Sequence, residues 1–148
     1  MFTVQDMMTP HPLFLSARDT IAQAKELMAK HGIRHLPIVD SHQHLLGLVT
    51  QRDILAAQES SLTHQSGGNR DSMMDTPLDA YTDRKLHSIS PKGGLKEAAK
   101  YMQHHKIGCL PVVSNQKLVG IITDTDFVSI AITLLEIQEE TEPLEEDE

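Results

Sequence analysis

Apolar residues follow one pattern of spacings twice along the chain. In the first half, a short apolar stretch at Leu13–Leu15 precedes helical spacing over 21–31. Two runs with strand character follow, Leu36–Val39 and Leu45–Thr50, separated by a polar turn. A second helical segment runs from about Arg52 to Ser60. The pattern predicts a strand, a helix, two strands and a helix, in that order.

The second half repeats this order with similar lengths. We expect a short strand at Ser88–Ser90 and a helix at Leu95–His105. Strands at Leu110–Val113 and Leu118–Thr123 follow, and a helix begins at about Asp124.

Local signals place the ends of the first helix of each half. Thr20 and Gln23 have the spacing of a capping box, in which each side chain satisfies a free backbone amide of the first turn. Gly32 suits the left-handed conformation that ends a helix. In the second half, Gly94 takes the capping position.

The two halves are copies of one another at a shift of 74 residues, which becomes 73 after the polar turn. Val4–Ser16 aligns without gaps on Leu78–Ser90. A repeat present only twice favours two similar units packed about a pseudo-twofold axis, because a solenoid needs three or more copies to bury its core. Such pairs leave matching clefts where the units meet, and clefts of this kind are common ligand sites.

We therefore expect an α/β (α+β) fold made of two β-α-β-β-α repeats. The expected boundaries are 1–61 for the first repeat, 62–77 for a flexible linker, 78–135 for the second repeat and 136–148 for an acidic tail.

The charge distribution and the single cysteine bear on the kind of partner and on the cellular compartment. The net charge of −8 arises in the tail, because 136–148 holds eight acidic residues and no base, and the remainder balances 13 acids against 13 Lys and Arg. No basic stripe points to nucleic acid. The single Cys109 fits a reducing compartment, and neither a signal peptide nor a membrane-spanning run is visible. A cytoplasmic protein is the expectation.

Two motifs resemble a known family. Ile33–Val39 (Ile-Arg-His-Leu-Pro-Ile-Val) followed by Gly47–Asp53 resembles a CBS domain, and so does Ile107–Val113 followed by Gly120–Asp126. Two copies in tandem resemble a CBS pair, or Bateman module. The resemblance implies adenosine-containing ligands in the clefts between repeats, dimerisation, and regulation of another protein without catalysis.

The Thr-x-x-Asp motif has a physical interpretation of its own. At Thr50–Asp53 and Thr123–Asp126 a strand ends and a helix begins, which leaves free amides where an anion can sit. The Asp carboxylate, one turn into the helix, can accept both hydroxyls of a ribose. The same residues can also be capping boxes alone.

The resemblance implies different roles for the remaining cleft residues. Residues just before the Leu-Pro strand reach the phosphate, and backbone and apolar groups of the opposite repeat hold the adenine. The candidate ligand-binding residues are Ile33, Arg34, His35, Thr50, Arg52, Asp53, Ile107, Gly108, Cys109, Thr123, Thr125 and Asp126. The cleft around Asp53 is expected to accept phosphate, and the cleft around Asp126 to be poorer in positive charge. Arg34 and His35 can alternatively be a solvated pair.

Two other kinds of site are considered and not favoured. His42, His44, His104 and His105 invite a metal, but no Cys, Asp or Glu completes a ligand set, so no metal site is expected. Cys109 has no evident base beside it, and a core or pocket-wall role is favoured over a nucleophile.

The sequence thus predicts a regulatory CBS pair, not an enzyme, that requires no cofactor and senses an adenine nucleotide for an unidentified protein effector. AMP, ADP or ATP is favoured over S-adenosylmethionine because Arg34, His35 and Arg52 can bind phosphate. The alternatives are an S-adenosylmethionine sensor and an interaction or dimerisation module with empty clefts.

The last predicted helix carries an unusually wide apolar face. Phe127, Ile130, Leu134 and Ile137 form one stripe, and further apolar residues widen it. Either this helix is deeply buried, or it packs against a second copy in a homodimer.

Overall fold

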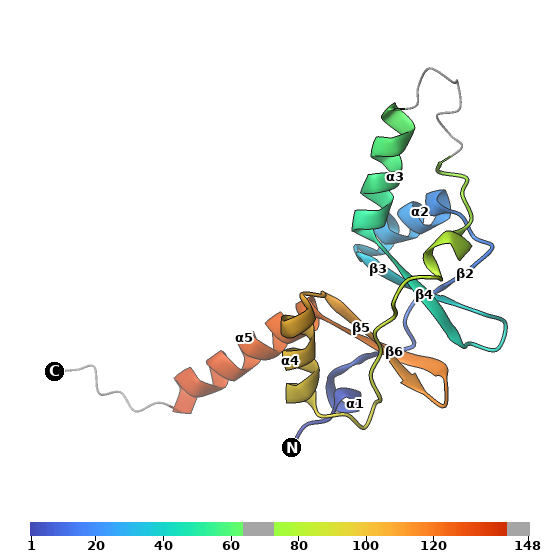
Figure 1. Ribbon diagram of the computed structural model, residues 1–148. Helices are drawn as coiled ribbons and strands as arrows, with labels where there is room; N and C mark the ends of the chain where they lie inside the picture. Colours follow the sequence, from blue (N-terminus) through green and yellow to red (C-terminus); the bar gives the residue numbers. More distant parts are fainter. Residues whose placement is uncertain (64–72, 142–148) are drawn as a thin grey trace.

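The computed structural model describes residues 1–63 and 73–141 and contains two similar halves, each built on a three-stranded sheet (Figure 1). Most of the predicted linker and the end of the acidic tail lie outside the described residues. The α+β fold with two repeats about a pseudo-twofold axis is confirmed.

The first half has the predicted order of elements. They are β2 (Leu15–Ser16), α2 (Ile21–His31), β3 (His35–Val39), β4 (Leu45–Thr50) and α3 (Gln51–Thr63). The sheet order is β2-β3-β4, with β2 parallel and β4 antiparallel to β3. The first strand starts later than predicted and is only two residues long.

The predicted signals at the ends of α2 are confirmed. The Gln23 backbone amide donates to the Thr20 hydroxyl at 3.3 Å, and the Gln23 side-chain oxygen accepts from the Thr20 amide at 2.8 Å. Gly32 ends the helix with a φ of 64°, a conformation that glycine adopts without steric cost.

The second half follows the same order except for its first strand. It contains α4 (Leu95–His105), β5 (Cys109–Ser114), β6 (Lys117–Thr123) and α5 (Asp124–Thr141). Of the strand predicted at 88–90, only Ile89 forms a bridge, to Val112. The sheet is completed instead by β1 (Thr9–Pro10), which pairs antiparallel with β6.

The two halves exchange their first segments. The helix α1 (Val4–Met7) packs on the second half, where Val4 is fully buried in the core. The 3₁₀ helix η2 (Leu78–Tyr81) packs on the first half, where Leu78 is fully buried. Each packing unit therefore takes its first segment from the other sequence repeat.

A glycine makes room for each exchanged segment. A Cβ on Gly47 in β4 would lie 2.6 Å from the carbonyl oxygen of Tyr81. A Cβ on Gly120, the matching residue of β6, would contact the sulfur of Met8. The repeated glycine is thus explained by the segment that crosses the strand at that point.

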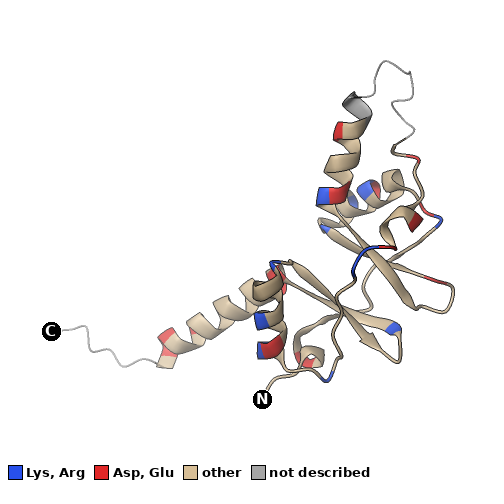
Figure 2. Ribbon diagram, viewed as in Figure 1, with Lys and Arg blue, Asp and Glu red and all other residues tan. Residues whose placement is uncertain are grey.

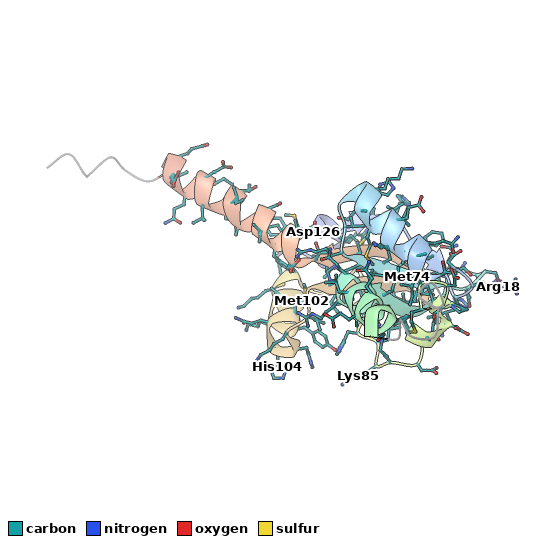
Figure 3. The ribbon with its side chains drawn as sticks, turned by 90° about the horizontal axis from the view of Figure 1, so that it is seen from above. Arg18, Met74, Lys85, Met102, His104 and Asp126 are labelled. Carbon is teal, nitrogen blue, oxygen red and sulfur yellow. The ribbon has the colours of Figure 1, made fainter. Side chains whose placement is uncertain are left out.

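The last helix is not deeply buried. Phe127 and Ile130 pack against the second core, but none of the α5 residues is buried. Seen from above, α5 leaves the rest of the molecule as an arm with Asp126 at its base (Figure 3). Deep burial, one of the two expectations for its apolar face, is wrong. No helix in the described ranges is both long and apolar enough to cross a membrane.

Candidate functional site

The larger cleft between the two halves has a volume of about 700 Å³, which lies within the range of small-molecule sites. Residues from both repeats line it. Seven of the predicted ligand-binding residues do so: Arg34, His35, Thr50, Arg52, Ile107, Gly108 and Cys109. The structure therefore brings together the phosphate and adenine groups that the sequence assigned to the first cleft.

The first cleft is strongly cationic. Five of its lining residues are basic: Arg34, Arg52, Arg84, Lys85 and Lys106. Among the described residues, Asp124 is the only carboxylate that lines it. A cleft lined mainly by one sign of charge concentrates ions of the opposite sign. Sequence reasoning missed Arg84, Lys85 and Lys106, because they lie outside the motifs and reach the cleft only through the path of the chain between the halves.

Thr50 and Asp53 form the predicted cap at the start of α3. The Asp53 carboxylate accepts from the Thr50 amide at 2.8 Å and from its hydroxyl at 3.1 Å, while the Asp53 amide donates to that hydroxyl at 3.3 Å. Thr123 and Asp126 make the same bonds at the start of α5. Both motifs therefore form helix caps, and the capping bonds fix the position of each carboxylate beside a cleft.

Asp53 also has a partner that the sequence did not indicate. The Arg84 guanidinium donates to both carboxylate oxygens, at 2.8 and 2.9 Å, and to the carbonyl oxygen of Leu48 at 2.7 Å. Burial raises the pKa of Asp53, but the hydrogen bonds from Arg84 and Thr50 outweigh burial and hold that pKa below its ordinary value. Asp53 is therefore ionised and already engaged. It lies behind Arg84 and is not itself among the residues that line the cleft.

Arg34 and His35 lie at the junction of the two clefts and line both. The Arg34 guanidinium is 3.9 Å from the Asp124 carboxylate, and both side chains are more than half exposed. Burial lowers the pKa of His35, although Asp124 acts in the opposite direction. A Cβ on Gly108 would lie 3.0 Å from the Asp124 carboxylate of the same repeat and 3.5 Å from His35 of the first repeat, so glycine leaves room for the Asp124 side chain at this junction.

The smaller cleft has a volume of about 450 Å³ and a different charge balance. The predicted residues Ile33, Thr123, Thr125 and Asp126 line it, and so do Asp124 and three histidines, His11, His31 and His35. Within the described part of the chain, Arg34 is the only Lys or Arg that lines this cleft, against two carboxylates. Arg34 and His35, expected at the first cleft, thus line the second cleft as well, and the second cleft has fewer basic lining residues than the first.

Comparison with known proteins agrees with this architecture. A sequence profile described as CBS domain matches residues 4–60 and again residues 78–132. The chain belongs to the CBS domain family. It carries two such domains in tandem, which confirms the resemblance noted in the motifs.

Solved structures of CBS pairs superpose over nearly the whole chain. A Vibrio cholerae protein named for acetoin utilization, AcuB, is 55% identical with a TM-score of 0.84, over 94% of this chain and 98% of that one. CBSX2 in complex with AMP is 25% identical with a TM-score of 0.75, over 90% of this chain and 98% of that one. The CBS pair of protein MJ0100, with 5′-methylthioadenosine and S-adenosyl-L-methionine, has the same identity, TM-score and coverage.

The chain also matches part of longer curated proteins. An uncharacterized 33.4 kDa protein of Thermofilum pendens is 30% identical over 128 residues, which are 85% of this chain and 42% of the relative. Inosine-5′-monophosphate dehydrogenase of Staphylococcus aureus is 30% identical over 122 residues, 81% of this chain and 22% of the enzyme. The present chain thus spans less than half the length of these relatives.

The surroundings of Cys109 and of the histidines do not suit a nucleophile or a metal site in the described residues. Cys109 starts the buried β5 strand, and burial raises the pKa of its thiol well above the ordinary value. A protonated thiol is a poor nucleophile, so Cys109 serves as cleft wall and core. Across the described ranges, no group of three or more His, Cys, Asp or Glu is placed to hold a metal ion.

Proposed function

We propose that this CBS pair is a regulatory module that binds an adenine nucleotide, AMP, ADP or ATP, in the first cleft and signals its occupancy to a protein partner. One observation carries the proposal: five basic residues from both repeats line a cleft beside the capped carboxylate of Asp53. The AMP complex of CBSX2 and the adenosyl ligands of the MJ0100 pair support the ligand class. A cytoplasmic location, favoured by the single thiol, is part of the proposal.

Five residues in or beside the first cleft have an assigned role in binding. Arg52, in the first turn of α3, and Arg34 bind the phosphate, where the helix N-terminus adds a partial positive charge. Ile107 and Gly108 of the opposite repeat offer backbone and apolar surface to the adenine. Asp53, which lies beside the cleft, accepts the ribose hydroxyls once Arg84 has left its carboxylate.

The two clefts suit different ligands. A sulfonium cation such as S-adenosylmethionine would be repelled by the basic residues of the first cleft. In the second cleft, Asp124 and Asp126 face the ligand space. An uncharged or cationic adenosyl ligand therefore fits the second cleft better, which keeps the S-adenosylmethionine alternative for that cleft alone.

We also propose that the chain forms a homodimer through α5. Val128, Ile132, Leu134, Leu135 and Ile137 are each more than half exposed on this helix. Burying about 400 Å² of apolar surface there would contribute roughly 10 kcal/mol before association entropy is subtracted. A second copy is the occupant that presents a matching apolar face.

Titration calorimetry with AMP, ADP, ATP, adenosine and S-adenosylmethionine tests the ligand. A ligand present at about 100 times its Kd should also raise the free energy of unfolding by about 2.7 kcal/mol. If none of these compounds binds, the alternative of an interaction or dimerisation module with empty clefts is favoured.

A matched pair of variants tests the cleft. Arg52 lines the first cleft, and Thr125 holds the equivalent position in the second. Arg52→Gln should weaken AMP binding about tenfold, or about 1.4 kcal/mol, because a charge-assisted bond to phosphate is lost. Thr125→Gln should leave AMP affinity unchanged. Equal losses in both variants would contradict assignment to the first cleft.

A further inference from the structure

Arg84 occupies the carboxylate that the proposed ribose needs. Its two terminal nitrogens lie 2.8 and 2.9 Å from the two oxygens of Asp53. The same carboxylate also accepts two bonds from Thr50. A carboxylate offers about four lone-pair positions, so two ribose hydroxyls cannot bond to Asp53 at full strength while Arg84 remains there.

The second repeat provides an internal comparison. The repeat shift of 74 places Pro10 at the position equivalent to Arg84, and proline has no side-chain donor. At Asp126, the only hydrogen bond from the exchanged segment among the described residues comes from the Thr9 hydroxyl, at 3.5 Å. The capping bonds of the two carboxylates are the same, so the arginine is the feature that distinguishes the first site.

The position of Arg84 would allow its side chain to break the ion pair with Asp53 and to bind an anionic ligand in the cleft instead. It lies on the segment between η2 and α4, outside the helices and strands, where Figure 2 shows basic residues between the two halves. About half of its side chain is exposed, and it lines the cleft together with Arg34 and Arg52. A phosphate in that cleft offers the guanidinium a bidentate partner that replaces the carboxylate.

We propose that Arg84 determines the ligand specificity of the first cleft by exchanging Asp53 for the ligand phosphate. In the free protein, Arg84 neutralises Asp53 and opposes ribose binding. A phosphorylated nucleoside compensates for the lost pair by binding Arg84, whereas adenosine cannot. The first cleft therefore rejects unphosphorylated adenosine, and the second cleft has no such filter. The inference rests on the proposed nucleotide function of the first cleft.

The test is calorimetric titration of wild type and Arg84→Gln with adenosine and with ATP. Arg84→Gln should bind adenosine at least threefold more tightly, because Asp53 is released. It should bind ATP at least threefold more weakly, because a phosphate partner is lost. The ratio of the two affinities should thus change about tenfold or more. A gain for both ligands would make Arg84 a simple block, and a loss for both would make it a structural residue; either result overturns the proposal, as does an unchanged adenosine affinity.

Lys85→Gln is the matched control. Lys85 lines the same cleft and loses the same charge, but no hydrogen bond or ion pair of its side chain occurs in the described part of the chain. It should weaken ATP binding without tightening adenosine binding. An equal gain for adenosine in Lys85→Gln would assign the effect to net charge and overturn the specific role of Arg84.

A ligand-free measurement separates this inference from the proposed function. Thermal unfolding of Arg84→Gln, Asp53→Asn and the double variant should show coupling between the two residues in the absence of nucleotide. If coupling is present but the adenosine and ATP affinities of Arg84→Gln do not diverge, the specificity role fails while nucleotide binding stands. If wild type binds no nucleotide, the proposed function fails, and the specificity role fails with it.

Discussion

At the scale of single residues, Asp53 and Asp126 show how one motif acquires two environments. Each carboxylate closes a cap with the threonine three residues before it. Only Asp53 also binds an arginine, and its pKa lies below the ordinary value because the bonds from Arg84 and Thr50 outweigh burial. The Thr-x-x-Asp motif thus positions the carboxylate, and the segment that carries Arg84 determines whether that carboxylate can accept a further hydrogen bond.

A consequence of this pairing is that the contribution of Asp53 to binding depends on Arg84. In the Arg84→Gln background, Asp53→Asn should weaken adenosine binding about tenfold, which is about 1.4 kcal/mol, because an available ribose acceptor is lost. With Arg84 present, the same change should cost less, since the acceptor is already occupied. Calorimetry of the four proteins checks this. Equal costs in both backgrounds would show that Arg84 does not compete for the carboxylate.

At the scale of elements, the central strands β4 and β6 are shaped by the segments that cross them. Gly47 lies against the backbone of η2, and Gly120 lies against the flexible side chain of Met8. A methyl group at the first position meets an atom that cannot move alone, whereas the methionine can change its rotamer.

Alanine substitutions at the two glycines should therefore differ in cost. Gly47→Ala should lower the free energy of unfolding by about 1–3 kcal/mol, the usual range for overpacking. Gly120→Ala should lower it by less, because the end of the Met8 side chain can change its rotamer. Chemical denaturation of both variants measures the difference. A cost at Gly120 equal to or larger than that at Gly47 would show that the crossing of η2 over β4 is not tight.

At the scale of the whole molecule, α5 is the element whose apolar surface the single chain does not cover. Leu134 and Leu135 are 58% and 59% exposed, whereas Phe127 and Ile130 contact the second core. The base of the helix therefore belongs to the fold, and its outer part is available to a partner.

We expect a homodimer in light scattering at micromolar concentration, and Leu134→Glu should shift it toward monomer because a charge would be buried in the seam. The monomeric variant should keep its fold, since Leu134 is exposed in the single chain. Val4→Glu is a contrasting control that should unfold the protein, because Val4 is fully buried. A monomeric wild type, or a Leu134→Glu variant that melts like Val4→Glu, would contradict assembly through α5.

The sequence by itself determined the main helices and strands of each repeat, the duplication and seven of the residues that line the first cleft. Helix caps such as Thr20 and Gly32 and the short apolar runs of the strands each involve only a few neighbouring positions, so they can be recognised from the sequence alone. The Leu-Pro strand and the Thr-x-x-Asp turn are likewise local, which is why Arg34, Thr50 and Gly108 could be assigned to one cleft in advance.

Only the tertiary structure decided how the halves share their segments and what Asp53 binds. The exchange places Val4 in the second core and Leu78 in the first, so each core depends on contacts between distant parts of the chain. Arg84 and Asp53 are separated by 31 positions, and no periodicity or motif relates them. Their pairing arises because η2 packs across β4 and delivers the following segment to the cleft, a consequence of three-dimensional packing that local spacing does not encode.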